Sequence, residues 1–447
     1  MMNDFEKYGI LDEVTPVGAP LSAKFKRSFA YYTIQQRLPI IVTKIIDQIT
    51  RDKDEIASEF DGDTTREDIK DVIANISQFK YELQTNKELT LLTGEEKDKD
   101  VWNTFIRQLG ENGTFFWTRW LYAECYMYRR LKSIFEATQS LKEYDYFRKQ
   151  KDAAFIGSSK SINLVLQYAE KFYSAHPARQ GTDIKQLEDF FYKLLRINLW
   201  GNRCDLSISN GRAMKQTDNP FESLASFESC ILADDSIAIW NCLKSGGSMC
   251  TIDFILDNAG YEVFTDLVLA DFILRYNFAN KIRLHCKAIP WFISDVVYSR
   301  DFHWTIKQLV HNESDTVKAI GNRLTEYING CRLELRPIEF FWTSPYEFQA
   351  MQTIAPALYS DLSTAHLLIF KGDLNYRKLL ADINWPFDSH FVDVLGPFRP
   401  TNLCTLRTVK ADLICELPLE KADELSKIDA MWMETGKYGV LHFAPKL

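Results

Sequence analysis

The chain has 447 residues, enough for a large core and for two structural units. Hydrophobic residues make up 46% and charged residues 26% of it, as in an ordinary soluble globular protein. The formal net charge of -8 argues against a general nucleic-acid binder, which needs a basic face, but leaves room for a small anionic substrate held by local cations.

The nine cysteines are dispersed and form no CxxC pair, which predicts reduced thiols in an intracellular protein rather than a zinc site. The first residues lack the basic and apolar regions of a signal peptide, and no apolar run of about 18 residues occurs. We therefore expect a cytosolic protein, with access to the nucleus left open. We expect no membrane or nucleic-acid partner, and the sequence leaves protein partners unspecified.

Helical patterns dominate the first half of the chain. Pro39 interrupts the first of them and should break or kink it, because proline lacks the amide donor. Apolar residues spaced by three and four predict a helix over 118–137. This is either a plain core helix or a lid from which Glu124 or an arginine faces the site. Two more amphipathic helices are expected over 159–175 and 184–199.

The pattern changes at LWGNRCDLSIS, where the polar residues Asn202 and Asp205 precede a loop-like stretch. From about residue 225 strands alternate with helical stretches, which predicts crossover units and a mostly parallel sheet. We therefore expect a helical amino-terminal domain over 1–190 and a catalytic α/β domain over 191–447. In the second domain we expect strands at 251–257, 281–286, LLIF, LCTLRTVK and YGVLHFA, and helices near 236–243, 261–275, 314–328 and 420–430.

Asp257 and Asn258 come directly after the apolar strand TIDFIL and before small residues and a helix. In an open α/β sheet, ligands bind at the carboxyl ends of the strands. A carboxylate and an amide oxygen suit a divalent cation, and Asp295, which follows the next strand, would add a second carboxylate. The alternative interpretation is helix capping, in which Asp and Asn accept backbone hydrogen bonds.

Two later segments carry cations at the ends of apolar runs. Lys371, Asp373, Asn375 and Arg377 follow LLIF, where they indicate either a site for phosphate and sugar hydroxyls or an exposed loop. In RTVK, Arg407 and Lys410 alternate with apolar residues. A charged side chain at the end of a buried strand is unusual unless it binds a ligand or forms an ion pair. The chain has no GxxxxGK[ST] loop, no GxSxG elbow and no HExxH, and its seven histidines do not cluster.

Together these motifs resemble the metal-dependent damage-control phosphatases, in the subfamily marked by RTxK, here Arg407, Thr408, Val409 and Lys410. The resemblance covers most of the chain in the correct order, through AYYTIQQRLPIIVTKIID, LYAECYMYRR, LWGNRCDLS, LDNAGYE, ISDV and FKGDLNYRKL. It implies an α/β fold, a three-layer α/β/α sandwich with a mostly parallel sheet, plus an amino-terminal all-helical portion.

The resemblance also implies one divalent metal ion held by Asp257, Asn258 and Asp295, with Mn²⁺, Co²⁺ or Ni²⁺ supporting activity better than Mg²⁺. Asp257 and Asn258 would also contact the substrate. The other substrate contacts would come from Asp373, Leu374, Asn375, Tyr376 and Arg377, and Lys410 would contact the phosphate. As supporting residues we expect Glu124, Asn202, Asp205, Glu262, Lys371 and Arg407.

The implied activity is hydrolysis of small phosphate monoesters, chiefly fructose 1-phosphate and related sugar phosphates. The nucleophile is left open between a metal-activated water and Asp257, which would form an aspartyl-phosphate. An alternative function in the same subfamily is an S-adenosylmethionine-dependent protein-glutamate O-methyltransferase, with Glu262 and Asp295 near the cofactor. No glycine-rich turn follows the first strand to support it. A non-catalytic binding protein is a third alternative.

Overall fold

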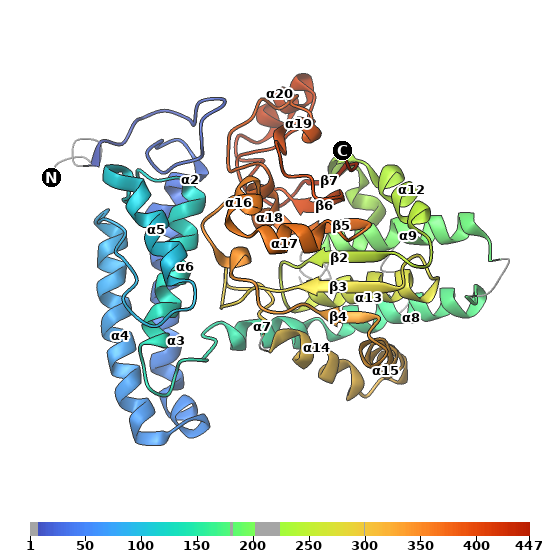
Figure 1. Cartoon of the computed structure of the whole chain (residues 1–447), viewed down its shortest axis with the longest axis horizontal. Coiled ribbons are helices and arrows are strands. Elements are labelled where there is room, and N and C mark those ends of the chain that lie inside the picture. The colour runs from blue at the N-terminus through green and yellow to red at the C-terminus, as the bar shows by residue number, and fades with distance from the viewer. Residues whose placement is uncertain (1–7, 179–181, 202–223, 299) are drawn as a thin grey trace.

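The structure is a computed structural model that describes residues 8–178, 182–201, 224–298 and 300–447 (Figure 1). Its centre is a seven-stranded sheet in the order β1-β7-β6-β5-β2-β3-β4. Its neighbouring strands are parallel except β6 and β7, so the expectation of a mostly parallel sheet is confirmed. The strands are β1 (Ile231–Asp234), β2 (Thr251–Ile255), β3 (Lys281–His285), β4 (Leu333–Leu335), β5 (Leu367–Lys371), β6 (Asn402–Thr408) and β7 (Gly439–Ala444).

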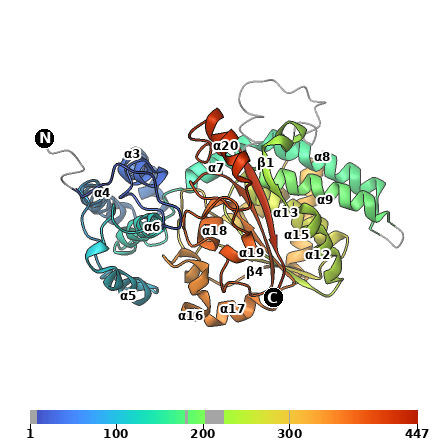
Figure 2. The same ribbon diagram turned by 90° about the horizontal axis from the view of Figure 1, so that it is seen from above.

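Helices cover both faces of the sheet, because the chain reverses its direction across the sheet after β4. From β1 to β4 the crossovers carry α12 (Ser236–Gly246), α13 (Tyr261–Arg275), α14 (Asp301–Val310) and α15 (Asp315–Asn329). From β4 to β6 they run back and carry α16 (Met351–Ile354), α17 (Pro356–Leu362), α18 (Gly372–Leu379) and α19 (Phe391–Val394). Parallel crossovers are right-handed, so the two groups lie on opposite faces. Figure 2 shows α12, α13 and α15 on one side of the strands and α16, α17 and α18 on the other, which confirms the three-layer sandwich.

The remaining described helices precede the sheet in the chain, apart from α20 and the 3₁₀ turns η4 and η5. They are α2 (Phe29–Tyr32), the π-helical turn η1 (Thr33–Arg37), α3 (Leu38–Glu59), α4 (Gly62–Gln84), α5 (Lys99–Leu109), η2 (Gly110–Asn112), α6 (Trp120–Glu136), α7 (Arg148–Gly157), α8 (Ser159–Ala175) and α9 (Ile184–Leu199). Later come η3 (Ala225–Cys230), η4 (Phe340–Thr343), η5 (Phe348–Ala350) and α20 (Leu419–Ile428).

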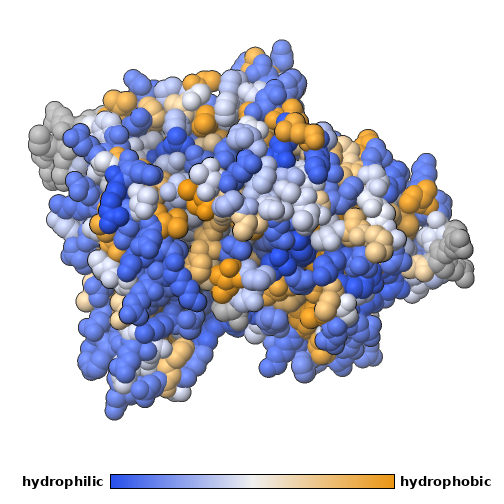
Figure 3. Space-filling view, in the orientation of Figure 1, coloured by the Kyte–Doolittle hydropathy of each residue, from blue (hydrophilic) through white to orange (hydrophobic). Residues whose placement is uncertain are grey.

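The helices of the first half lie in two places (Figure 1). Helices α3 to α6 stand beside the sheet, and the surface over α4 is mostly hydrophilic in Figure 3. Helices α8 and α9 instead pack against α15 and α13 of the sandwich. The division into domains near residue 190 stays a prediction. Among the described residues, no helix is both long and apolar enough to cross a membrane.

Pro39 does not end the first helix, contrary to one of the two outcomes expected for it. It lies in the first turn of α3, where a missing amide is tolerated. Directly before it, η1 widens the helix by one residue, and the Leu38 amide bonds to the Thr33 carbonyl. The chain therefore passes from α2 to α3 without a break but with a changed helical register.

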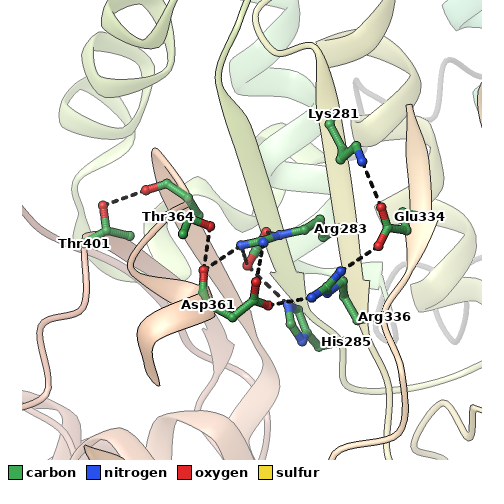
Figure 4. A network of polar contacts seen from close by, with 10 residues as sticks. Lys281, Arg283, His285, Glu334, Arg336, Asp361, Thr364 and Thr401 are labelled. Atoms are coloured by element: carbon green, nitrogen blue, oxygen red, sulfur yellow. Dashed lines mark hydrogen bonds and ion pairs between the residues drawn. The ribbon is translucent and has the colours of Figure 1, made fainter. Parts of the chain in front are cut away.

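A network of ions with a buried centre joins β2, β3 and β4 to the helix α17 (Figure 4). Arg283 of β3 donates to both carboxylate oxygens of Asp253 on β2, at 2.5 and 2.7 Å, and to Asp361. Asp253 is fully buried, and His285 lies 3.2 Å from it. Because an unpaired charge inside a sheet is costly, these pairs favour the observed register of β2 against β3.

Candidate active site

The candidate site lies where the sheet changes its winding direction, at the carboxyl ends of β2 and β5. The helix after β2 covers one face of the sheet and the helix after β5 covers the other, so a crevice opens between the two strands. Asp257 and Asn258 follow β2, and Asp373 follows β5 at the start of α18. These carboxyl ends face helices α2 and α6, and both sets of elements line one cavity.

The loop after β3 carries Asp295 to the same place. Its backbone pairs with the end of β2 in both directions, since the Val296 amide donates to the Asp257 carbonyl at 2.8 Å and the Ala259 amide donates to the Ser294 carbonyl at 2.6 Å. Phe292 and Ile293 in this loop have φ angles of 41° and 70°, which are strained for residues with side chains. The structure thus brings together Asp257, Asn258 and Asp295, as the sequence predicts.

The side chains of this group form an acidic cluster. The Asn258 amide nitrogen donates to Asp257 at 2.9 Å and to Glu262 at 2.8 Å, and the Asn258 oxygen accepts from the Ser294 hydroxyl at 2.5 Å. Burial raises the pKa of Asp257 well above its usual value, and the charges of Asp295 and Glu262 raise it further. Burial likewise raises the pKa of Asp295 to about 6, against the opposing effect of Lys287, whose Nζ lies 3.4 Å away.

This cluster fits a divalent cation. The amide nitrogen of Asn258 lies between two carboxylates, where a positive charge would relieve their repulsion. A rotation of the Asn258 side-chain amide exchanges the places of its nitrogen and its oxygen. The oxygen would then lie between the carboxylates, and the nitrogen could donate to the Ser294 hydroxyl, which can also accept. The donor set would then be the carboxylates of Asp257 and Asp295 and the amide oxygen of Asn258, which suits a hard or borderline metal ion.

Gly372 leaves the space that Asp257 needs. Its φ angle is +80°, and a Cβ atom there would lie 1.8 Å from the Asp257 carboxylate oxygen Oδ2. A residue with a side chain would therefore be strained and would also displace Asp257. The glycine in KGDLNYR is needed both for the turn into α18 and for the acidic cluster.

A cavity of about 520 Å³ opens over the cluster. Its walls come from α2, η1 and α6 on one side and from the ends of β2, β3, β5 and β6 on the other. Its described lining residues are Phe29, Tyr32, Arg37, Trp120, Glu124, Leu199, Asp257, Asn258, Glu262, Phe292, Ile293, Ser294, Asp295, Gly372, Asp373, Leu374, Arg377, Leu406, Thr408, Lys410 and Glu434.

The DLNYR segment contributes only part of its side chains to this cavity. It forms the buried helix α18 rather than an exposed loop. Asp373, Leu374 and Arg377 line the cavity. Asn375 instead donates to the Lys371 carbonyl at 2.7 Å, and the Tyr376 hydroxyl lies 3.3 Å from the Cys415 sulfur.

Arg377 is a cavity residue whose charge is already paired. Its guanidinium donates to Asp382 at 2.7 and 3.1 Å and to Glu124 of α6 at 2.7 Å. Its Cζ atom lies 3.6 Å from the centre of the Trp120 ring. Glu124 therefore lines the cavity from α6, which is otherwise a buried core helix, and its contact with Arg377 joins α6 to α18.

The two cations of RTVK have different places. Arg407 is fully buried, donates to Asp373 at 2.7 Å and to the Leu413 carbonyl at 2.7 Å, and lies over the ring of Tyr376. It does not line the cavity. Lys410 is exposed at the cavity wall, and its backbone amide lies 3.3 Å from Asp373.

The remaining expected residues divide in the same way. Glu262 lines the cavity, and behind it the buried Lys371 lies 3.5 Å from Glu262 and 2.7 Å from Asp266. Lys371 thus holds Glu262 from outside the cavity. Asn202 and Asp205 lie outside the described residues.

Sequence reasoning missed several cavity residues, chiefly Arg37, Ser294 and Glu434. Burial and the nearby Asp412 charge raise the pKa of Glu434 to about 7. Arg37 and Ser294 lie in segments that the resemblance already covered, AYYTIQQRLPII and ISDV, so their proximity to those motifs was the available signal.

Comparisons with known proteins agree with this picture. The family model described as the damage-control phosphatase ARMT1-like domain matches residues 33–425. Damage-control phosphatase ARMT1 of Danio rerio is 40% identical over 437 residues, which are 95% of this chain and 96% of the relative. The protein of the same name from Homo sapiens is 38% identical over 440 residues, 96% of this chain and 98% of the relative.

A solved structure of a DUF89 family protein from Pyrococcus horikoshii is also similar, at 14% identity and a TM-score of 0.40. It covers 85% of this chain and 91% of its own. At that level of similarity, the fold assignment rests on the strands and helices described above.

Proposed function

Because this chain belongs to the damage-control phosphatase ARMT1-like family, we propose that it hydrolyses fructose 1-phosphate and related sugar phosphates at the cavity described above. Membership makes the chain a phosphatase of metabolite repair, a phosphoric monoester hydrolase. The choice of substrate and metal and the roles of the residues are our proposal.

One observation supports the proposal. The same cavity is lined by an acidic cluster that can bind a metal ion and by two basic side chains that form no ion pair with a described residue. Asp257, Asn258 and Asp295 form the first group. Arg37 and Lys410 line the same cavity and form no ion pair with any described residue. A phosphate monoester needs both, since its negative charge must be neutralised where it is attacked.

The proposed cofactor is one divalent metal ion, Mn²⁺, Co²⁺ or Ni²⁺ in preference to Mg²⁺. Asp257, Asn258 and Asp295 would hold it. When bound, such an ion acts as a Lewis acid on the phosphoryl group. Carboxylate and amide oxygens suit Mn²⁺ and Mg²⁺ alike, so the proposed order of metals rests on the family resemblance and not on the donor set.

The protein's own residues have separate tasks. Lys410 binds the phosphate as a flexible point charge from the cavity wall. Asp373 accepts hydrogen bonds from sugar hydroxyls, and Arg407 fixes its position. Arg377 of α18 and Glu124 of α6 bind each other and together form one wall of the cavity. The buried Asn375 and Tyr376 support α18 rather than contact the substrate. Hydrolysis forms a bond from a water oxygen to phosphorus and breaks the ester bond, and the departing alcohol takes up a proton.

The test is phosphate release by the purified chain from a panel of sugar phosphates and other metabolite phosphates, each with Mg²⁺, Mn²⁺, Co²⁺ or Ni²⁺. We expect release that depends on the metal and is highest for fructose 1-phosphate. Asp257→Ala should reduce it by at least 100-fold, because a ligand of the metal and its charge are lost.

The control is Asp361→Ala, which removes a partly exposed carboxylate of the ion network that does not line the cavity. It should keep metal-dependent release. Absence of release with any of the four metals would contradict the proposal. Methyl transfer from S-adenosylmethionine to a glutamate side chain, unaffected by Asp257→Ala, would favour the methyltransferase instead.

A further inference from the structure

The cavity over the acidic cluster has three basic residues among its described lining, and their charges are not equally available. These are Arg37, Arg377 and Lys410. Arg377 is buried and is neutralised by Asp382 and Glu124. The other two have no ion pair among the described residues. Arg37 is therefore one of two cations that can meet a substrate anion, and it comes from the helical region rather than from the sandwich.

The π-helical turn η1 explains how Arg37 reaches the cavity. Tyr32 and Arg37 both line it, although residues five apart lie about 140° apart around an ordinary α-helix, at 100° per residue. In η1 the Leu38 amide bonds to the Thr33 carbonyl, five residues back. A turn closed in this way brings residues five apart onto neighbouring positions of the same face, and such turns are frequent at functional sites.

The surroundings of Arg37 hold its guanidinium without neutralising it. The group lies over the ring of Phe29, 5.1 Å from the ring centre. The Phe29 backbone amide donates to Asp412 at 3.3 Å, which ties α2 to the segment after β6. The positive charge of Arg37 also lowers the pKa of Glu434, against the stronger effect of burial, which raises it. An aromatic face can orient a guanidinium and leaves its hydrogen-bond donors available.

Apart from Glu434, whose raised pKa of about 7 reduces its charge near neutral pH, the other carboxylates of the wall are already matched. Asp373 pairs with Arg407, Glu262 with Lys371, and Glu124 with Arg377. A metal ion would match Asp257 and Asp295. Two cations then remain for an anion that carries up to two charges, which is the charge of a phosphate monoester near neutral pH.

We propose that Arg37 is a phosphate-binding residue of this enzyme, which grips the substrate phosphate together with Lys410 from the opposite wall. This proposal rests on the proposed phosphatase function and extends the active site into the amino-terminal helical region. Arg37 offers several donors in a planar fork, which matches two phosphate oxygens at once, whereas Lys410 supplies a single point of charge.

The test compares Arg37→Gln and Arg37→Lys with the unchanged protein in two measurements. The first is kcat/KM for the best phosphate ester with Mn²⁺. The second is calorimetric binding of inorganic phosphate to the Mn²⁺-loaded protein, which needs no turnover. We expect Arg37→Gln to lower both by roughly 10- to 100-fold, the loss for a charge-assisted hydrogen bond, and Arg37→Lys to recover part of it. The Mn²⁺ concentration for half-maximal binding should stay unchanged.

The matched control is Arg51→Gln, which replaces an exposed arginine of α3 that pairs with Asp47 and does not line the cavity. It should leave both quantities unchanged. Wild-type affinity for inorganic phosphate in Arg37→Gln would overturn the assignment of Arg37, whether or not the esters are hydrolysed. Weakened phosphate binding without any ester hydrolysis would support the role of Arg37 and contradict the phosphatase function, so the two failures are separate.

Discussion

At the scale of single residues, the acidic cluster depends on the glycine that begins α18. Gly372 has a φ angle of +80°, and an added methyl group would collide with Asp257. We expect Gly372→Ala to lower kcat by at least 10-fold, because Asp257 must move, and to destabilise the fold by about 1–2 kcal/mol through backbone strain. Phosphate-release kinetics and urea unfolding measure the two effects.

The backbone effect and the collision can be separated with Gly18→Ala as the control. Gly18 has nearly the same φ angle, +79°, but no atom lies within 4 Å of the position of its added Cβ. This variant should show the backbone cost alone and normal kinetics. Equal kcat in Gly372→Ala and the unchanged protein would mean that Asp257 is not held as tightly as we infer.

At the scale of elements, the RTVK segment at the end of β6 combines a structural cation with an available one. Arg407 is buried and holds Asp373 and two backbone carbonyls, of Leu413 and Ala411. We expect Arg407→Gln to lower the free energy of unfolding by about 3 kcal/mol, because these buried acceptors lose their partner. Lys410→Gln should change it by less than about 0.5 kcal/mol, since Lys410 is exposed.

The two variants should also differ in kinetics. Lys410→Gln should raise KM and lower kcat/KM through weaker phosphate binding, with a normal unfolding curve. Urea denaturation gives the unfolding free energy of each variant, and steady-state kinetics gives its kcat/KM. If Lys410→Gln were the less stable of the two, our assignment of roles within this motif would be wrong.

Helix periodicity explains which parts of these elements the sequence predicts. The helices expected over 159–175, 184–199 and 261–275 agree with α8, α9 and α13, because strong apolar patterns set their bounds. In DLNYR, helix periodicity predicts that only some of the five side chains face the cavity. Asp373 and Arg377 are four apart and share a face of α18, whereas Asn375 and Tyr376 point elsewhere.

Features that depend on contacts between residues distant in the sequence are harder to predict from it. The four-residue strand β1 has too few residues to show alternation and was not predicted. The position of Arg37 depends on a π-helical turn and on the packing of α2 against the segment after β6, neither of which a local pattern encodes. The meeting of Asp257 and Asp295 was predictable, because the carboxyl ends of parallel strands share one edge.

At the scale of the whole molecule, buried ionisable groups make stability depend on pH. His442 of β7 is fully buried, and burial, with the nearby Arg407 charge, lowers its pKa to about 3. A histidine whose pKa falls on folding stabilises the protein above its unfolded pKa of about 6.5, and this contribution is lost as pH falls from 6.5 toward 3. We therefore expect acid destabilisation to begin near pH 6.5.

Replacing His442 tests this origin. The ring packs against Phe391 and Tyr376, so His442→Phe should be accommodated. Between pH 6.5 and 4.5 the variant should lose roughly 2 kcal/mol less unfolding free energy than the unchanged protein. Urea titrations at several pH values measure the difference, with exposed His303→Phe as the control. Parallel pH curves for His442→Phe and the unchanged protein would show that another group causes the acid sensitivity.

The helical region and the sandwich both line the cavity, so we infer that they act as one catalytic unit. We propose that a metal ion at Asp257, Asn258 and Asp295 supports hydrolysis of sugar phosphates there. The most direct measurement is Mn²⁺-dependent phosphate release from fructose 1-phosphate by metal-stripped protein and by Asp257→Ala. We predict that release rises with Mn²⁺ to saturation in the unchanged protein and stays at background in the variant. Release without added metal, or equal release by the variant, would contradict the claim.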